Sequence, residues 1–202
     1  MQINIDKKTG VLLGIIILLS TLLFTIRTNR DGGSDFMGMG HGTSSTQSSS
    51  DDSYTGADIM FLQMMIPHHQ QAVDISNLAL KTSKDSELLA LAKTIRDAQS
   101  AEIIQMKMWL KEAGAGTDMG HSMDGMGGML DDAELSALSA ATGKNFDTLW
   151  LKGMIGHHDG AIHMTTMIND AQNTEIKTFG ENVVKDQSAQ IKQMEAMLKR
   201  LS

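Results

Sequence analysis

Hydrophobic residues recur every three or four positions along two long stretches of the chain, residues 57–113 and 145–201. Late in the first stretch, the apolar stripe runs through Leu88, Ala92, Ile95, Gln99, Ile103, Met106 and Leu110. Late in the second, it runs through Ile176, Gly180, Val183, Gln187, Ile191, Met194 and Leu198. This spacing is typical of amphipathic helices with one buried face. Each stretch is long enough for a pair of helices.

The first helix of each pair has a stripe that includes a histidine. In the first stretch it consists of Ile59, Leu62, Ile66, His69, Val73, Ser76 and Leu80. In the second it consists of Leu151, Ile155, His158, Ile162 and Thr165. We therefore expect His69 and His158 to point toward the core. Their neighbours His68 and His157, about 100° further around the helix, are expected at its margin.

The two stretches are repeats of one another. The segment "MMIPHH" (64–69) corresponds to "MIGHH" (154–158), and "QSAEIIQM" (99–106) corresponds to "QSAQIKQM" (187–194). Two matching segments in the same order indicate a duplicated helical hairpin. The sequence therefore predicts an all-α four-helix bundle over residues 57–202, built from two repeated hairpins.

Residues typical of helix ends mark several boundaries. Ser83 and Asn173 are expected N-caps, and Gly114 is expected just past a helix C-terminus. Asp131 and Glu134 have the spacing of a capping box that opens a short helix. We expect Gly143 to end that helix.

Three segments outside the repeats have a different composition. Residues 11–26, "VLLGIIILLSTLLFTI", are apolar and lie between two lysines and two arginines, which predicts a membrane signal-anchor within residues 1–30. A cleaved signal peptide is the alternative. Residues 31–56 are rich in Gly and Ser and predict a flexible linker, and residues 114–130 predict a Gly-rich loop. We expect the bundle to face the periplasm or the cell exterior, either membrane-anchored or secreted.

The composition limits the chemistry. The net charge is −7, which argues against a nucleic-acid partner. There is no cysteine, so the chain has no disulfide and no thiolate ligand. Methionine occurs 17 times, whereas aromatic residues make up only 4% of the chain. The excess of methionine calls for an explanation beyond core packing.

The repeats place sulfur and nitrogen donors together. Met64 and Met65 lie one helical turn before the histidine pair at 68–69, and Met154 lies one turn before the pair at 157–158. Pro67 and Gly156 precede the two pairs and predict local unwinding that lets the side chains converge, unless the kink only eases packing. On the second helices, we expect the buried amides of Gln99 and Gln187 to pair with the facing histidines. The nearby candidate ligands are Glu102, Met106 and Met194.

Thioether and imidazole ligands together favour Cu(I) or Ag(I), with Cu(II) as a further candidate. Methionine and histidine also occur beside glycine outside the helices, where no core needs filling. We predict accessory ligands there at Met37, Met39, His41, Met119, His121, Met123 and Met126. Because imidazole ligands must be neutral, we expect binding to weaken below about pH 6.

These motifs resemble the CopM-like family of exported bacterial proteins that carry a domain of unknown function. The resemblance covers about 58–113 and 145–201, including "FLQMMIPHHQQAV" and "NFDTLWLKGMIGHHDGAI". It implies a ferritin-like bundle and, because some members bind copper and are linked to copper resistance, copper binding and tolerance. It also implies a copper-transport or efflux protein as partner. The residues that it carries over as ligands are Met65, His68, His69, Gln99, Glu102, Met106, Met154, His157, His158, Gln187 and Met194.

The second repeat departs from the family pattern. Gln190 stands where the family has Glu, so the second site is expected to carry less charge. His163 and Met167 have no counterpart in the first repeat and are predicted to add ligands to the second site.

Two other functions remain open from the residues alone. A ferritin-like metal-dependent oxidase would need four core carboxylates and Glu-x-x-His pairs. In this chain no Glu precedes a His by three positions, and Glu102 is the only strong candidate for a core carboxylate. A scaffold or partner-binding bundle would use the histidines only as hydrogen-bonding groups of the core.

Overall fold

The computed structural model describes residues 53–118 and 127–202 of the chain, and this part is all-helical. Four long helices account for most of it, with a short helix and a 3₁₀ turn between them. In chain order they are α2 (Gly56–Thr82), α3 (Ser86–Glu112), α4 (Asp132–Ala140), α5 (Gly143–Met164), η1 (Thr165–Ile168) and α6 (Thr174–Leu201). The predicted all-α fold built from two helical hairpins is confirmed.

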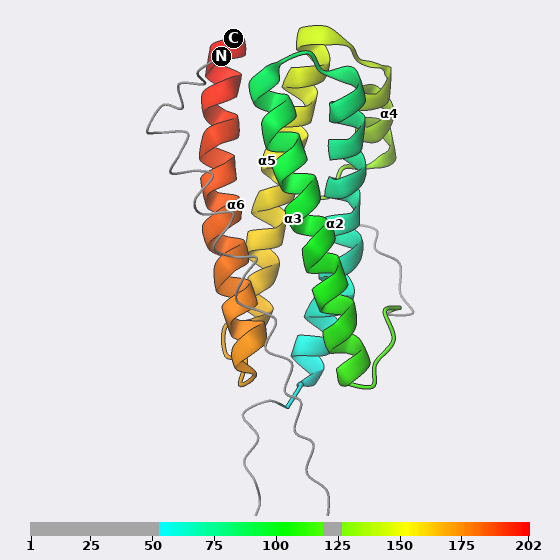
Figure 1. The fold of residues 1–202 in the computed structure, drawn as a ribbon, viewed down its shortest axis with the longest axis vertical. Helices are drawn as coiled ribbons and strands as arrows, with labels where there is room; N and C mark the ends of the chain where they lie inside the picture. Colours follow the sequence, from blue (N-terminus) through cyan, green and yellow to red (C-terminus); the bar gives the residue numbers. More distant parts are fainter. Residues whose placement is uncertain (1–52, 119–126) are drawn as a thin grey trace, which may run out of the picture. The chain divides into compact units, whose positions relative to one another are not determined.

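The two hairpins pack side by side with one long connection between them (Figure 1). Helices α2 and α6 run in one direction, and α3 and α5 run in the other. Because α3 and α5 are parallel, residues 113–142 must return along the length of the bundle before α5 begins. This crossover carries α4, which packs on α5. One long crossover is the topology of ferritin-like bundles.

Several predicted helix ends are confirmed. Asn173 caps α6, and its side chain accepts hydrogen bonds from the N–H groups of Glu175 and Ile176. Asp131 and Glu134 form the predicted capping box of α4. Gly114 lies just past α3 with φ of 69°. The N–H groups of Gly114 and Ala115 bond back to the last turn of α3, which satisfies carbonyls that the helix leaves free.

Two predicted ends are wrong. Ser83 closes α2, and α3 is capped instead by Asp85, whose carboxylate accepts from the N–H groups of Glu87 and Leu88. The Ser83 hydroxyl is engaged elsewhere, because it donates to the Asp147 carboxylate and accepts from the Asp85 N–H. Gly143 does not end α4, which stops at Ala140; it begins α5 with φ of 56°.

Pro67 and Gly156 do not interrupt their helices. Both α2 and α5 continue as α-helix through these positions, so the predicted local unwinding is not found. A single lost hydrogen bond at Pro67 is tolerated because the flanking turns are packed on both sides.

The apolar core consists of two clusters at opposite ends of the bundle. One gathers the C-terminal half of α2 and the N-terminal half of α5 around Trp150, with residues of α3, α4 and α6. The other gathers the N-terminal half of α2 and the C-terminal half of α5, with residues of α3, η1 and α6 around Phe61. The hairpins are joined by Trp150, whose Nε1 donates to the Ile75 carbonyl at 3.1 Å, and by Trp109, whose Nε1 donates to Glu175 at 2.9 Å.

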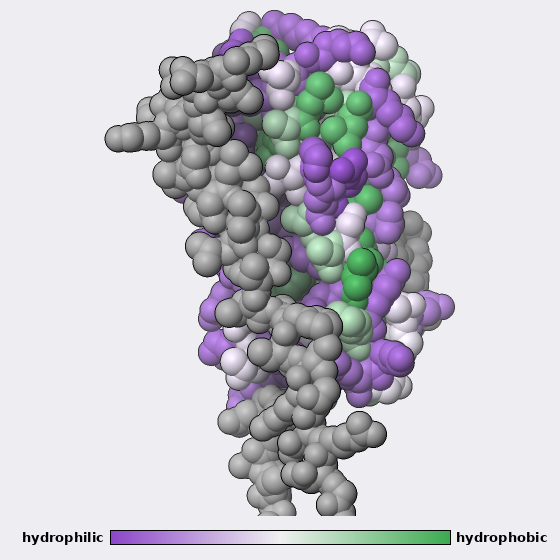
Figure 2. Space-filling view, in the orientation of Figure 1, coloured by the Kyte–Doolittle hydropathy of each residue, from purple (hydrophilic) through white to green (hydrophobic). Residues whose placement is uncertain are grey.

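The surface is mixed in character. Figure 2 shows one face on which hydrophilic side chains are interrupted by hydrophobic ones. In the part of the chain that the structure describes, the exposed large hydrophobic side chains lie on three different helices: Met60, Ile104, Met108 and Val184. Among residues 53–118 and 127–202, no helix is both long and apolar enough to cross a membrane. The predicted signal-anchor and the linker up to residue 52 lie outside these ranges.

Candidate metal centre

A layer of polar side chains separates the two apolar clusters. It contains the four histidines at 68, 69, 157 and 158, the amides Gln99, Gln187 and Gln190, and Glu102; we call these eight residues the histidine layer. All four histidines are 0% exposed. Burial of His69 and His158 is as predicted. The expected marginal position of His68 and His157 is wrong, because these two residues lie where the hairpins meet, with ring centroids 3.8 Å apart.

Three of the four imidazoles are fixed through Nε2. The Nε2 atom of His69 lies 2.8 Å from the Glu102 carboxylate, and that of His158 lies 2.6 Å from the Gln190 carbonyl oxygen. The Nε2 atom of His157 lies 2.9 Å from the backbone carbonyl oxygen of His68. Each of these partners is an oxygen acceptor. Each imidazole must therefore carry its proton on Nε2 and donate it.

The other ring nitrogen of each fixed histidine has no partner. The Nδ1 atoms of His69, His157 and His158 are buried and make no hydrogen bond. With the proton on Nε2, each Nδ1 presents a lone pair to the interior. An Nε2–H held by an oxygen acceptor, with the opposite nitrogen free, is the arrangement of metal-ligating histidines in proteins.

Burial keeps these imidazoles neutral. It lowers the pKa of His68 to about 3, with the neighbouring His69 adding to the effect. Burial also lowers the pKa of His158 to about 4, against the hydrogen bond to Gln190, which raises it. The pKa of His157 falls well below its usual range for the same reason. At neutral pH these three side chains are unprotonated, which is the form that binds metals.

The two halves of the layer differ in charge. His69 faces a carboxylate, whereas His158 faces an amide. A second carboxylate, Asp186 on α6, lies near the first half. Its pKa is raised mainly by burial, and Glu102 raises it further. The first half of the layer is therefore more negative than the second.

Buried methionines border the layer on both sides. Met65 and Met106 belong to the apolar cluster around Phe61, and Met154 and Met194 belong to the cluster around Trp150. All four are 0% exposed. Side chains in a helix lean toward its N-terminus, so His69 leans over Met65 and His158 leans over Met154. Each hairpin thus brings two thioethers to the edge of the layer.

The amides Gln99 and Gln187 do not pair with the histidines as predicted. Both are buried, but their side-chain oxygens have no hydrogen-bond partner. The histidines bond instead to the residues three positions further along each helix. Gln190 is thereby placed in the site, and its alignment with Glu102 in the repeat is the signal in the sequence that identifies it.

Three other predicted ligands are not buried at the edge of the layer. His163 is exposed in the last turn of α5, and Met167 is half-buried in η1. Met167 packs on the cluster around Phe61, opposite the methionines of the second repeat, so it cannot join their site. Met64 is half-buried at the edge of the same cluster.

The crossover is held against the layer from outside. Gln71 of α2 makes two hydrogen bonds to the backbone of Leu130, at 2.8 and 2.9 Å. A backbone group of Gly127 reaches His68. Gly128, with φ of 86°, and Gly160 of α5 lie so close that a Cβ on either would overlap the other's backbone. These contacts close the outer side of the layer, and no sequence pattern pointed to them.

The accessory ligands lie outside the described residues, namely Met37, Met39, His41, Met119, His121, Met123 and Met126. The residues on either side of the second group of these ligands, 119–126, are held by contacts with the bundle. The Gln63 side chain donates to the carbonyl oxygens of Gly116 and Asp118, and Gly127 packs on α5.

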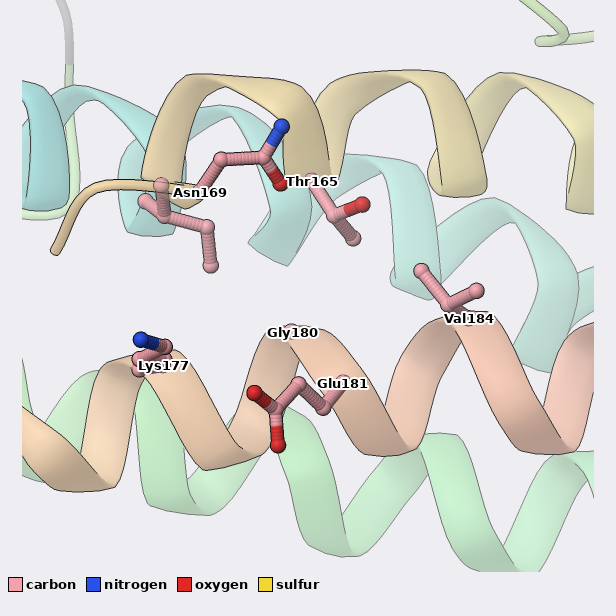
Figure 3. A pocket seen from close by; sticks show the side chains of 7 residues that line it. Thr165, Asn169, Lys177, Gly180, Glu181 and Val184 are labelled. Atoms are coloured by element: carbon pink, nitrogen blue, oxygen red, sulfur yellow. The ribbon is translucent and has the colours of Figure 1, made fainter.

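Two surface clefts of the described residues lie away from the layer. One of about 250 Å³ lies between η1 and α6 (Figure 3). Thr165 and Asn169 line it on one side, and Lys177, Gly180, Glu181 and Val184 line it on the other. Another, of about 450 Å³, lies between α5 and the end of α6 and carries three lysines. Neither is lined by a histidine or a methionine.

Nitrogen and carboxylate donors alone do not complete a site. Within residues 53–118 and 127–202, no group of three or more His, Asp or Glu side chains is placed to hold a metal ion. A metal in the layer would therefore also need the bordering thioethers as ligands. Such a mixed donor set suits a soft cation.

Comparison with known proteins assigns the family. The model of the domain of unknown function DUF305 matches residues 58–198. The chain belongs to this family. No curated protein matches it.

Solved DUF305 structures share the fold. A fragment from Deinococcus radiodurans is 31% identical, with a TM-score of 0.69 over 73% of this chain and 99% of that one. A candidate secreted protein from Streptomyces coelicolor is 29% identical, with a TM-score of 0.67 over 76% of this chain and 94% of that one. CopM in its Cu(II)-bound form is 32% identical, with a TM-score of 0.60 over 72% of this chain and 97% of that one. CopM also has Cu(I)-bound and silver-bound structures. The similarity to CopM-like proteins is confirmed.

Proposed function

We propose that this DUF305 protein binds copper outside the cytoplasm, chiefly as Cu(I), and that it sequesters or relays the ion in copper tolerance. One observation carries the proposal: three buried imidazoles are fixed through Nε2 and present an unpartnered Nδ1. The bordering thioethers supply the remaining soft ligands. Ag(I), which has similar ligand preferences, would bind in the same places, and the metal-bound CopM structures support both ions.

A purely structural role for the histidines explains these atoms less well. A buried polar atom without a partner costs about 1–3 kcal/mol, and the layer contains several. A core that used imidazoles only as hydrogen-bonding groups would be expected to satisfy both ring nitrogens. Here the unpaired Nδ1 atoms of His69, His157 and His158 each have a lone pair that could bind a cation.

An oxidase role has less support. A di-metal oxidase centre uses four carboxylates from the bundle helices, whereas the histidine layer contains one, Glu102, with Asp186 close to it. We therefore infer a binding protein and not an enzyme. Oxygen consumption by the copper- or iron-loaded protein would overturn this part of the proposal.

The proposed location and partners follow from the sequence. The apolar segment at 11–26 would anchor the bundle to the membrane or direct its secretion. A copper-transport or efflux protein would then be the partner in a relay. Fractionation of cells that produce the full chain, with and without residues 1–30, tests the membrane attachment.

The binding proposal is tested by counting tightly bound ions. In the variant His158→Leu/Gln190→Leu, one half of the layer loses an imidazole ligand and the residue that orients it, while its volume is kept. We expect it to bind one Ag(I) or Cu(I) fewer than the wild type in competition with a chelator. The control is His163→Leu, which removes an exposed histidine outside the layer. Equal stoichiometry in all three proteins would contradict the proposal.

A further inference from the structure

The histidine layer lacks an obvious route for an ion. Its four histidines are 0% exposed, and the clefts at η1–α6 and α5–α6 are lined by other residues. The crossover residues from Gly127 to Leu130 cover its outer side. A metal site in a protein needs an entry path as well as ligands.

Three side chains with soft donor atoms lie at successive turns of α2, between the solvent and the layer. Met60, Met64 and His68 are spaced four residues apart, so each lies one turn above the previous one and about 40° further around the helix. Because of this rotation, each side chain is more buried than the previous one. Met60 is 51% exposed, Met64 is half-buried and His68 is 0% exposed.

A third thioether, Met167, lies on η1, which packs on α2. The contacts of His157 with the His68 backbone, and of Trp150 with the Ile75 backbone, fix the antiparallel register of the two helices. Continued past the end of α5, this register places Met167 near the level of Asp58, less than one turn from Met60. The 3₁₀ turn that carries Met167 packs on α2, and Met167 and Met64 pack on the same apolar cluster.

Core packing does not explain Met60. Its side chain is half exposed and contributes little to a core. Single apolar side chains are common on protein surfaces, so Met60 is distinguished by its neighbours and not by its exposure. Met108 on α3, the other exposed methionine within residues 53–118 and 127–202, is 46% exposed but has Ile104 and Glu112 one turn away on either side. Met108 is therefore about as exposed as Met60, but it has no soft donor one turn away.

We propose that Met60, Met64 and Met167 form an entry site for soft monovalent cations, from which the ion passes to His68 and into the layer. This inference rests on the proposed function, because the route leads to the proposed metal centre. Each step exchanges a thioether ligand for the next donor, and the ion keeps its charge throughout. Thioethers suit this role because they bind Cu(I) and Ag(I) as neutral ligands at any physiological pH.

The test compares rates of uptake in full-length variants. Ag(I) is offered as a coloured chelate, and its transfer is followed by stopped-flow absorbance. The phase whose amplitude falls in His158→Leu/Gln190→Leu reports filling of the layer. In Met60→Leu/Met64→Leu we expect this phase to slow by roughly tenfold or more, since each substitution removes a ligand, while its amplitude stays the same. Leucine keeps the apolar volume, so the fold is retained.

Met108→Leu is the matched control and should fill at the wild-type rate. A second readout is the ε-methyl NMR signals of the methionines: those of Met60 and Met64 should respond to Ag(I), and that of Met108 should not. Equal filling rates in the wild type and Met60→Leu/Met64→Leu would overturn the entry site alone. If no phase loses amplitude in His158→Leu/Gln190→Leu, the layer is not filled, and both proposals fail.

Discussion

At the scale of single residues, the site depends on which nitrogen of each imidazole carries the proton. Glu102, Gln190 and the His68 carbonyl oxygen each accept from an Nε2–H, which leaves Nδ1 as the available ligand atom. The acceptors thus act on the metal through the histidines and are positioning residues. Their loss would free the imidazole to rotate or to change tautomer.

The carboxylate of Glu102 can be tested in this positioning role. We expect Glu102→Ala to weaken Ag(I) or Cu(I) binding at the first half of the layer by about 10–100-fold, because His69 loses its fixed orientation. Glu102→Gln keeps an oxygen acceptor, as Gln190 does in the second half, and should lose much less. Competition titrations measure both affinities. If the two variants bind equally weakly, the charge of Glu102 matters and the acceptor geometry does not.

At the scale of helices, glycines let the crossover approach α5. Gly160 faces the backbone of Gly127, whereas Gly156, one turn earlier on the same helix, faces open space. The two glycines are equivalent in helix propensity but not in packing. Alanine substitutions at these two positions therefore distinguish the free-energy cost of a steric clash from the gain in helix propensity.

We expect opposite effects from alanine at these two positions. Gly160→Ala should destabilise the protein by about 1–3 kcal/mol or more, since its Cβ would overlap the Gly127 carbonyl. Gly156→Ala should stabilise it by up to about 1 kcal/mol, the difference in helix propensity. Urea denaturation measures both free energies of unfolding. Equal stabilisation by both substitutions would show that the crossover does not pack on α5.

Element by element, the sequence predicted the helices well but not their contacts. The stripe on α3 is buried at each predicted position, because periodicity reports the buried face of one helix. Periodicity underestimated the buried surface of α2. This helix packs against α3 with one part of its surface and against α5 with another. His68 lies on the second part and was therefore placed at the margin. The choice of Glu102 over Gln99 as partner of His69 depends on side-chain direction, which spacing does not give. The contact between Gly127 and Gly160 is long-range and leaves no local pattern.

At the scale of the whole molecule, the histidine layer costs stability so that donors stay available. It interrupts the apolar core between the clusters around Phe61 and Trp150 and contains buried polar atoms without partners. Filling one half with apolar side chains should leave the metal-free protein equally stable or more stable, because replacing both partners by groups of similar shape removes their desolvation cost. Thermal melts of His158→Leu/Gln190→Leu without metal measure this. A large loss of stability would mean that the layer mainly holds the fold together.

The lowered pKa values predict how stability depends on pH. In the unfolded chain, histidine takes up a proton near its ordinary pKa of 6.5, whereas folded His68 and His158 stay neutral down to about 3 and 4. Below pH 6.5 the unfolded state therefore binds more protons than the folded state. As the pH is lowered through this range, the free energy of unfolding should decrease, by about 1.4 kcal/mol per pH unit for each such histidine.

Urea denaturation without metal at several pH values between 4 and 7 checks this slope, with His157→Leu expected to reduce it. The same lowered pKa values mean that protons compete with copper for these imidazoles only below the value near pH 6 that free imidazole suggests. In the folded bundle, the pKa of about 4 keeps His158 neutral until the pH approaches that value.

The most direct test of the central claim is the anomalous scattering of silver in crystals of the Ag(I)-loaded protein. The account predicts silver at Nδ1 of His69 and His158, with a methionine sulfur of the same hairpin as a further ligand. Silver found only elsewhere on the chain, with both of these nitrogens still unliganded, would contradict it.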